Sequence, residues 1–303
     1  MKTNLMDIGF TIMKNFLKII KSKLQKLPAG EETGAFTETS WLLRTSSSIY
    51  PFEAKALKTW GLKNYNQDPN CNLVYFGMYH DGDYKSLFFH KGKTVILWAG
   101  SDILALKDKP DIQKKIIEKK SIHYCENNVE QKELEEMGIK AEVVPSFLED
   151  INDFPISFKP TKPFKIFLSG HPDRENEYGF DLIGRLADEF KDVEFHLYGA
   201  VGGLDKENVV EHGLIDNNAF NEQIKGYHCG LRPNRHDGAS EIMVKSILLG
   251  QYPITYIDYP FVSSFKKYHE LKMQIKETIK KKEPNYKARE EWVKILNKYI
   301  WVK

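Results

Sequence analysis

The stretch Leu231-Arg-Pro-Asn-Arg-His-Asp-Gly-Ala-Ser-Glu241 is the most informative part of the sequence. It follows a short apolar segment at 229–231 and leads as a polar loop into a helix that we expect over 241–249. Gly250 suits the end of that helix, and Pro253-Ile-Thr-Tyr256 has the composition of a further strand. A strand, a loop, a helix and a second strand in this order predict an α/β unit with parallel strands.

The same alternation extends through most of the chain. Apolar runs of strand character lie at 73–77, 94–98, 122–125, 141–144, 164–168 and 193–198. Such continuous runs are typical of parallel strands that are buried on both faces. Three prolines mark 151–163 as a linker, because proline neither continues a helix nor donates to a central ladder. The sequence therefore predicts two α/β sheets joined by a linker.

These boundaries divide the chain into three segments. We expect an N-terminal Rossmann-like domain over 1–157 and a C-terminal one over 158–284, with a final helix in 285–303 that packs back on the first domain. Ligands of open α/β sheets bind beyond the carboxyl ends of the strands. The loops after Trp98, Leu168, Tyr198 and Leu231 should therefore line a cleft between the domains. Residues 28–70 contain a helix candidate at 52–60 and no recognisable site.

Composition excludes several classes of protein. The chain has 303 residues, of which 41% are hydrophobic and 28% charged, which argues against a disordered, collagenous or coiled-coil protein. A net charge of +2 is not by itself the footprint of a nucleic-acid-binding protein. Cys71, Cys125 and Cys229 are far apart and form no Cys-x-x-Cys, which argues against disulfides and zinc and favours a reducing cytosol.

Residues 8–27 predict a basic amphipathic helix. Apolar residues recur at helical spacing at Ile12, Phe16, Ile20, Leu24 and Leu27, with lysines between them. No apolar run reaches the ~20 residues that a membrane-spanning helix needs. A helix of this kind can lie on anionic lipid. The alternative is a helix that packs on its own domain and exposes its lysines.

The loop before Glu241 combines cations with the start of a helix. Helix N-termini carry free N–H groups and a partial positive charge, so they bind phosphates well. Arg232 and Arg235 can neutralise a diphosphate through forked hydrogen bonds, and Gly238 would let the backbone approach a ligand closely. The loop therefore predicts an anion site. The alternative is a polar loop in which Arg235 and Asp237 pair only with each other.

This segment, with Gly250 and Pro253 after it, resembles the donor-site motif of family 4-like glycosyltransferases. Further pieces follow in the order of that family: Trp98-Ala-Gly-Ser-Asp102, Val143-Val-Pro145, 164–170 with Tyr178-Gly179, and His212-Gly213. The similarity covers roughly residues 72–256. It implies the GT-B fold, in which two Rossmann-like domains face each other across a cleft.

The resemblance also implies roles for individual residues. Catalytic roles fall on Asp237, Arg235 and His236. Donor-binding roles fall on Gly170, Arg174, Tyr178, Gly199, His212, Arg232, Gly238, Ser240, Glu241 and Lys245. Acceptor-side roles fall on Trp98, Gly100, Ser101 and Asp102. No metal site is implied, and the nucleotide-sugar is a co-substrate rather than a cofactor.

The sequence departs from the family pattern at the second motif position. The family has Glu, seven residues and Glu, where the first carboxylate lies against the donor sugar and the second holds the ribose hydroxyls. Here the two positions are Asp237 and Lys245, and an ammonium group cannot accept a hydrogen bond. Either the ribose contact is lost, or Glu241, one turn earlier, supplies it. Glu241 and Lys245 could also form an ordinary i, i+4 ion pair on the helix surface.

A second departure concerns the phosphate-binding cations. His171 stands where the family has Arg, and Tyr178 stands before Gly179 where the family has Lys. Arg174 is the nearest cation that can replace them.

Asp81-Gly-Asp83 is a candidate for a different chemistry. A D-x-D pattern can bind Mg²⁺ or Mn²⁺ through its carboxylates. The alternative, which we favour, is an ordinary polar turn over 80–83 after the preceding strand.

Together these features predict a retaining hexosyl- or pentosyltransferase that moves a sugar from a nucleotide-sugar to a glycan or lipid-linked acceptor. The helix over 8–27 would place it in the cytoplasm, at the inner face of a membrane. One alternative is a viral or phage glycosyltransferase acting on modified DNA bases, which the lysine-rich tracts at 114–120 and 276–282 permit. Another is a non-catalytic protein that binds nucleotide-sugars or recruits a partner through a degenerate site.

Overall fold

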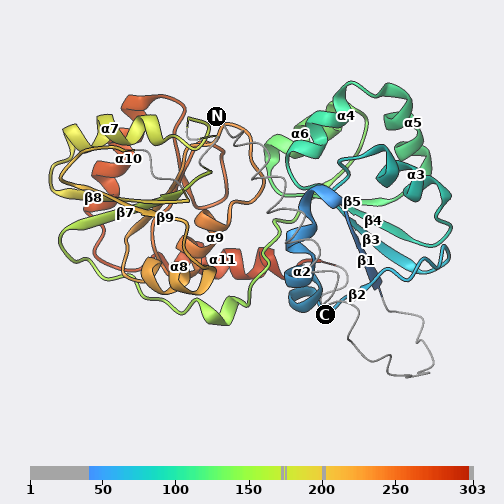
Figure 1. Ribbon diagram of the computed structural model, residues 1–303, viewed down its shortest axis with the longest axis horizontal. Coiled ribbons are helices and arrows are strands. Elements are labelled where there is room, and N and C mark those ends of the chain that lie inside the picture. The colour runs from blue at the N-terminus through green and yellow to red at the C-terminus, as the bar shows by residue number, and fades with distance from the viewer. Residues whose placement is uncertain (1–40, 172–173, 175, 200–202, 300–303) are drawn as a thin grey trace, which may run out of the picture. The chain divides into compact units, whose positions relative to one another are not determined.

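The computed structural model describes residues 41–171, 174, 176–199 and 203–299. The helix expected over 8–27 lies outside these residues. The chain from Ser40 to Lys303 forms one compact unit. Its described part contains two six-stranded parallel sheets (Figure 1). We call the half with β1–β6 the N-lobe and the half with β7–β12 the C-lobe.

The N-lobe sheet has the strand order β2-β1-β3-β4-β5-β6. Its strands are β1 (Trp41–Thr45), β2 (Lys63–Asn64), β3 (Asn72–Phe76), β4 (Thr94–Leu97), β5 (Ile122–Cys125) and β6 (Glu142–Val143). Its helices are η1 (Ser47–Phe52), α2 (Glu53–Trp60), α3 (Asp81–Phe89), α4 (Ser101–Lys107), α5 (Pro110–Lys119) and α6 (Asn128–Glu136).

The C-lobe sheet has the strand order β12-β11-β10-β7-β8-β9. Its strands are β7 (Phe164–Ser169), β8 (Val193–Tyr198), β9 (Val209–Gly213), β10 (Cys229–Arg232), β11 (Ile254–Thr255) and β12 (Ser263–Ser264). Its helices are α7 (Phe180–Glu189), α8 (Asn217–Ile224), α9 (Glu241–Leu248), α10 (Tyr268–Ile279) and α11 (Tyr286–Leu296), and η2 (Ile151–Asp153) lies in the connection between the lobes.

Both faces of each sheet are buried, which explains the continuous apolar runs. In β3, Leu73 packs with residues of α3 and α5, whereas Val74 packs on the opposite face with residues of α2. In β7, Ile166 packs with α7 and α10, whereas Phe167 packs with α8, α9 and α11. Successive side chains of a strand point to opposite faces, so a strand covered on both sides needs apolar residues throughout.

Three elements differ from the sequence-based expectation. The N-lobe sheet begins at β1, which pairs with β3 from Trp41 opposite Asn72 to Thr45 opposite Phe76, in a region where we expected no strand. Ser101 and Asp102 begin the helix α4 instead of continuing the loop after Trp98.

The third difference is at 80–83, where a turn was expected and helix α3 begins at Asp81. The Asp83 carboxylate accepts from the backbone N–H of His80, 3.1 Å away, and Asp81 pairs with Lys109 at 2.8 Å. The turn prediction was therefore wrong, because the two acids serve the first turn of a helix, where negative charge is favoured.

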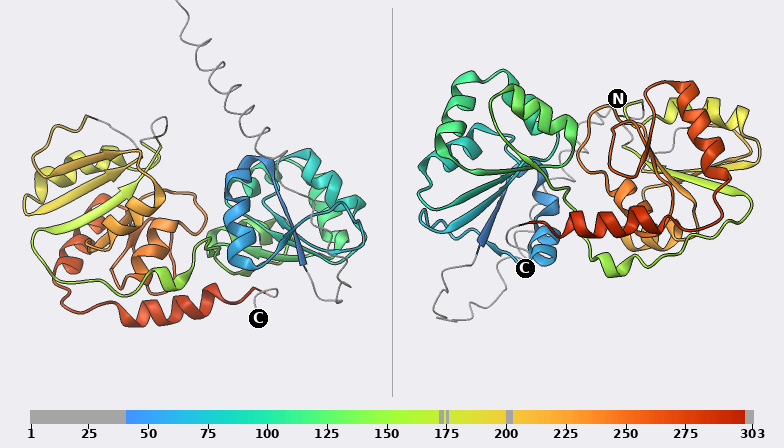
Figure 2. Two further views of the ribbon diagram at one scale, coloured as in Figure 1. Left: turned by 60° about the horizontal axis from the view of Figure 1, so that its bottom comes forward. Right: turned by 180° about the vertical axis from the view of Figure 1, so that it is seen from behind.

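Helix α11 lies against α9 of the C-lobe, and the chain then continues to the N-lobe (Figure 2). Trp292 of α11 is buried in the C-lobe core, and its indole N–H donates to the carbonyl of Pro260 at 2.9 Å. Tyr299 is buried against N-lobe residues, and its hydroxyl donates to the carbonyl of Val144 at 2.9 Å. The segment after 285 therefore contacts both lobes.

Candidate functional site

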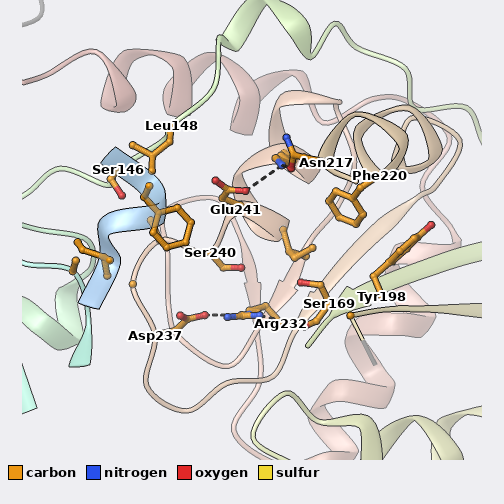
Figure 3. A pocket seen from close by; sticks show the side chains of 18 of the residues that line it. Ser146, Leu148, Ser169, Tyr198, Asn217, Phe220, Arg232, Asp237, Ser240 and Glu241 are labelled. Carbon is orange, nitrogen blue, oxygen red and sulfur yellow. Dashed lines mark hydrogen bonds and ion pairs between the residues drawn. The ribbon is translucent and has the colours of Figure 1, made fainter. Parts of the chain in front are cut away.

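A pocket of about 490 Å³ lies where strands of both sheets end (Figure 3). The loops expected to line a cleft all contribute to it, through Ala99, Ser169, Gly199 and Arg232. Its remaining lining residues include Phe76, Glu126 and Ser146 from the N-lobe side and Tyr198, Asn217, Phe220, Asp237, Ser240, Glu241 and Lys245 from the C-lobe side. The pocket therefore occupies the position in which open α/β sheets bind their ligands.

One wall of the pocket joins a guanidinium group to a helix N-terminus. Arg232, at the end of β10, donates from Nε to Asp237 Oδ2 at 2.6 Å and from Nη1 to the carbonyl of Ser169 at 3.3 Å. Its guanidinium lies 4.6 Å from the ring centroid of Tyr178. Ser240 is the N-cap of α9, and its side chain makes no capping hydrogen bond. A fixed cation beside a helix N-terminus is suited to an anionic group.

The opposite wall is aromatic. Tyr198 and Phe220 line the pocket, with ring centroids 4.9 Å apart in an edge-to-face arrangement. The ring of His212 does not line the pocket but stacks on Tyr198, with the ring centroids 4.3 Å apart and the ring planes almost parallel. The Tyr198 hydroxyl donates to Gln223 Oε1 at 2.7 Å. These contacts fix an aromatic surface of the kind on which a planar ring can pack.

Lys245 is buried between the two walls. Its ammonium group is 2.8 Å from Glu149 Oε1 and 3.1 Å from Glu241 Oε2, and it donates to Asn217 Oδ1 at 3.3 Å. Burial alone would raise the pKa of Glu149, but the ammonium of Lys245 and hydrogen bonds from Asn217 and Asn221 together outweigh it and hold that pKa below its usual value. The Glu241–Lys245 pair is therefore part of a buried network and not a solvated pair on a helix surface. Glu241 remains one third exposed and lines the pocket.

Two predicted catalytic residues lie elsewhere. Arg235 is exposed, with its guanidinium 5.9 Å from the ring centroid of Tyr256, and His236 Nε2 is 3.0 Å from Glu133 Oε2 of helix α6. Neither side chain lines the pocket. Asp237 does line it, and its partner is Arg232, not the Arg235 that the alternative interpretation assumed.

Gly170 and Arg174, two predicted donor-site residues that follow β7, do not line the pocket either. Arg174 is exposed and pairs with Glu177, outside the pocket. Gly170 and Gly199 lie face to face, because a Cβ on Gly199 would come within 2.1 Å of the Gly170 carbonyl oxygen. The absence of a Cβ at Gly199 therefore allows the ends of β7 and β8 to approach each other.

The expected acceptor-side residues are largely structural. Trp98 is fully buried, and its indole N–H donates to His123 Nδ1 at 3.3 Å. Asp102 is also fully buried and accepts from the backbone N–H groups of Met78, Ala99 and Ile103. Burial raises the pKa of Asp102 to about 7, against the opposing effect of these hydrogen bonds. Gly100 and Ser101 lie beside the pocket but do not line it.

Sequence reasoning missed most of the N-lobe wall. Ile49 and Phe52 come from a region in which no site was recognised, and Phe76 and Leu148 were not expected to line the pocket. Glu126 and Ser146 follow β5 and β6, and the Ser146 hydroxyl donates to Glu126. The one available signal was their place just beyond the carboxyl ends of predicted strands.

Among the described residues, no group of three or more His, Cys, Asp or Glu side chains is arranged to hold a metal ion. The D-x-D acids belong to helix α3, as described above. The same residues include no helix that is both long and apolar enough to cross a membrane.

No protein-family model matches the sequence, and no curated protein sequence matches it. Solved structures do match. HepE from Anabaena, solved with UDP and glucose, has a TM-score of 0.57 at 12% identity, over 84% of this chain and 96% of that one. WaaB, a lipopolysaccharide outer core galactosyltransferase, has a TM-score of 0.55 at 10% identity, over 87% and 96% of the two chains.

TarM from S. aureus, solved with UDP and α-GlcNAc-glycerol, has a TM-score of 0.53 at 13% identity. The match covers 76% of this chain and 52% of TarM, so the chain spans about half the length of that enzyme. At such identities the likeness concerns the fold. The predicted architecture, two Rossmann-like lobes in the GT-B arrangement, is thereby confirmed.

Proposed function

We propose that this chain is a glycosyltransferase that takes its sugar from a nucleotide-sugar donor. The observation that carries the proposal is the combination of groups around one pocket. Arg232 and the N-terminus of α9, the aromatic side chains of Tyr198 and Phe220, and the Glu241 carboxylate all line it (Figure 3). A nucleoside diphosphate presents one charged, one aromatic and one hydroxylated part, and each of these groups suits one of them.

Each part of the donor then has a partner. The diphosphate binds at Arg232 and at the free N–H groups of α9, which suit a doubly charged anion. The base packs against Tyr198 and Phe220. The ribose hydroxyls donate to Glu241, since Lys245 holds that carboxylate in place and cannot accept a hydrogen bond itself.

The sugar extends from the diphosphate towards Asp237 and the N-lobe wall. We propose transfer with retention of configuration, in which Arg232 and helix α9 stabilise the charge that develops on the departing diphosphate. The acceptor binds beside Ile49, Phe52 and Ala99 of the N-lobe. A glycan or lipid-linked acceptor is consistent with two of the similar structures, since WaaB is a lipopolysaccharide outer core galactosyltransferase and TarM was solved with α-GlcNAc-glycerol.

Binding of UDP, GDP and ADP to the purified chain, followed by hydrolysis of the matching nucleotide-sugars, tests this proposal. A nucleotide present at 100 times its Kd should add about 2.7 kcal/mol to the unfolding free energy. Arg232→Ala should weaken nucleotide binding by about 10- to 100-fold, because a charge-assisted bond to phosphate is lost. Arg185→Ala is the matched control, since Arg185 is exposed on α7 and packs on Tyr268. If no nucleotide binds, or Arg232→Ala binds as the wild type does, the proposed site is wrong.

We propose further that transfer needs no divalent cation, because Arg232 and the α9 N-terminus would supply the positive charge. Transfer measured after EDTA treatment should equal transfer measured with added Mg²⁺ or Mn²⁺. Activity that EDTA abolishes and a metal ion restores would contradict this.

The second candidate is a protein that binds nucleotide-sugars without transferring them. It is favoured by the pairing of both site cations with acids of the chain, Arg232 with Asp237 and Lys245 with Glu149. Such a protein would bind a nucleotide and hydrolyse no donor. Hydrolysis or transfer by the wild type decides between the two candidates.

A further inference from the structure

The C-lobe loop at 236–239 is hydrogen-bonded to the N-lobe at three successive points. His236 Nε2 is 3.0 Å from Glu133 Oε2, and Asn127 Nδ2 donates to the Asp237 carbonyl at 2.7 Å. The backbone N–H of Ala239 donates to Glu126 Oε2 at 2.9 Å. These N-lobe partners lie in and immediately before helix α6. The loop therefore has its conformation set partly by the other lobe.

Glu126 is the buried acid of this contact, with only 6% of its surface exposed. Both carboxylate oxygens face donors: Oε1 accepts from the backbone N–H of Ser146, at 3.3 Å, and from the Ser146 hydroxyl, while Oε2 accepts from Ala239. Burial of a carboxylate is costly unless hydrogen bonds compensate for it, and here one of the compensating donors comes from the C-lobe.

Gly238 explains how the carboxylate reaches the loop. A Cβ at this position would lie 1.6 Å from Glu126 Oε2, closer than any non-bonded atoms can be. On its other side the Gly238 carbonyl accepts from the Tyr259 hydroxyl at 2.5 Å. From the sequence, Gly238 was expected to allow the close approach of a ligand, whereas in the structure a protein carboxylate lies against it.

The loop that Glu126 contacts carries the chemistry of the pocket. Asp237, within it, holds the guanidinium of Arg232 at 2.6 Å. Ser240, directly after it, is the N-cap of α9. A shift of the loop would therefore move both the cation and the helix N-terminus that form one wall of the pocket.

We propose that Glu126 is a positioning residue, which holds the loop at 236–240 from the opposite lobe and so completes the donor wall only while the two lobes are bonded together. The part of this inference that concerns nucleotide binding rests on the proposed function. The hydrogen-bonded contact itself does not.

Hydrogen exchange of the backbone amides in 236–241 tests the contact without reference to activity. Glu126→Gln is informative because glutamine offers one acceptor oxygen where the protein needs two, so its amide nitrogen must face a donor. We expect exchange in 236–241 to accelerate by about tenfold or more, while the amides of β7 and β8 exchange as in the wild type.

Two further variants make the test specific. Asn127→Asp keeps the side-chain oxygen that caps α6 through Val129 and Glu130, but replaces the donor to the Asp237 carbonyl with an acceptor. It should accelerate exchange in the same segment. Asp83→Asn is the control, since Asp83 is a buried N-lobe acid that accepts from Ser46 and His80, within its own lobe. It should leave exchange in 236–241 unchanged.

Exchange in 236–241 that matches the wild type in both Glu126→Gln and Asn127→Asp would overturn the inference. So would acceleration of equal size in Asp83→Asn, because the effect would then be a general loss of N-lobe stability.

Nucleotide binding separates this inference from the proposed function. If the wild type binds a nucleoside diphosphate, Glu126→Gln should raise its Kd at least about fivefold, whereas Asp83→Asn should not. Faster exchange in Glu126→Gln with an unchanged Kd would show that the contact exists but does not position the donor wall. That result would overturn the role assigned to Glu126. If the wild type binds no nucleotide, the proposed function fails, and the exchange experiment still decides whether the contact exists.

Discussion

At the scale of single residues, Lys245 is a buried ammonium group between two carboxylates. Breaking such a pair by removing one partner typically costs about 3–5 kcal/mol, because the remaining charge stays buried and unpaired. We expect Lys245→Met to lower the unfolding free energy by about 3 kcal/mol, reduced from the upper end because Glu241 is partly exposed. Urea unfolding measures the change. The double variant Lys245→Met/Glu149→Gln should recover part of the loss, and no recovery would mean that Glu149 is not the main partner.

The same geometry predicts that a glutamate at position 245 destabilises the protein. Lys245→Glu would place a third carboxylate beside Glu149 and Glu241, at the position that the ammonium now neutralises. We expect this variant to be less stable than Lys245→Met in the same urea experiment.

His123 gives a prediction on pH. Burial lowers its pKa to about 4 from the usual 6.5, and its Nδ1 accepts from the Trp98 indole. Between these two pKa values the unfolded chain binds a proton that the folded chain does not, so the stability is complete above pH 6.5 and is lost as the pH falls towards 4. His123→Asn keeps an acceptor for Trp98 and removes the titration. Wild type should lose about 2 kcal/mol relative to this variant between pH 7.5 and pH 5, measured by urea unfolding. Parallel pH profiles would contradict the shift.

The sequence located the loops that line the candidate site, but it indicated individual side chains best where they follow one another in the chain. Arg232, Asp237 and Ser240 belong to one loop whose composition indicated an anion site, and all three line the pocket. Arg235 and His236 stand in the same loop and point elsewhere, because side-chain direction depends on contacts with Tyr256 and Glu133. No local sequence pattern marks Glu126, because the hydrogen bond that connects it to the donor wall comes from Ala239, more than a hundred positions away.

At the scale of elements, the ends of β7 and β8 lie so close together that position 199 has no room for a Cβ. Gly199 has φ +88°, and a Cβ there would lie 2.1 Å from the Gly170 carbonyl oxygen. Gly199→Ala should destabilise the protein by about 2 kcal/mol or more, because it combines backbone strain with a clash against backbone. Gly61→Ala is the matched control: Gly61 has φ +64° with no atom within 4 Å of the added Cβ, so only the strain of about 1 kcal/mol should appear. Equal losses in thermal or urea unfolding would show that the contact with Gly170 contributes nothing.

Most strands could be predicted because strands buried on both faces are continuous apolar runs. Strand β1 was not predicted, because Trp41–Thr45 is short, contains Arg44 and borders residues in which no alternation of strands and helices was recognised. It is specified by its neighbour: β1 pairs with β3 along its whole length. The helix that ends near His90 was expected, but its start at Asp81 was not, because Asp, Gly and Asp in sequence favour a turn locally. In the structure the Asp83 carboxylate accepts from the His80 backbone and Asp81 bonds to Lys109, so both acids belong to the first turn of α3.

At the scale of the whole molecule, the two lobes are joined by more than the linker. Helix α11 is fixed in the C-lobe through Trp292, and Tyr299, beyond it, is buried in the N-lobe between Trp60 and Tyr124. The chain thus returns to the N-lobe after completing the C-lobe. Tyr299 follows the last C-lobe helix but packs in the N-lobe core. The stabilities of the two lobes are therefore coupled, because neither lobe can unfold without disturbing this segment.

This coupling predicts the effect of substitutions at Tyr299. Tyr299→Ala should cost about 3–5 kcal/mol, the usual loss for a large buried aromatic side chain. Tyr299→Phe should cost only about 1 kcal/mol, since it keeps the ring and loses the hydrogen bond to the Val144 carbonyl. Hydrogen exchange during urea unfolding should show the amides of β3 and β4 opening at lower urea than those of β7 and β8 in Tyr299→Ala, and together with them in the wild type. Because Trp292 stays in place in this variant, the C-lobe should keep its own protection; if both lobes instead lose protection equally, Tyr299 stabilises the molecule as one cooperative body and not as the tie between two.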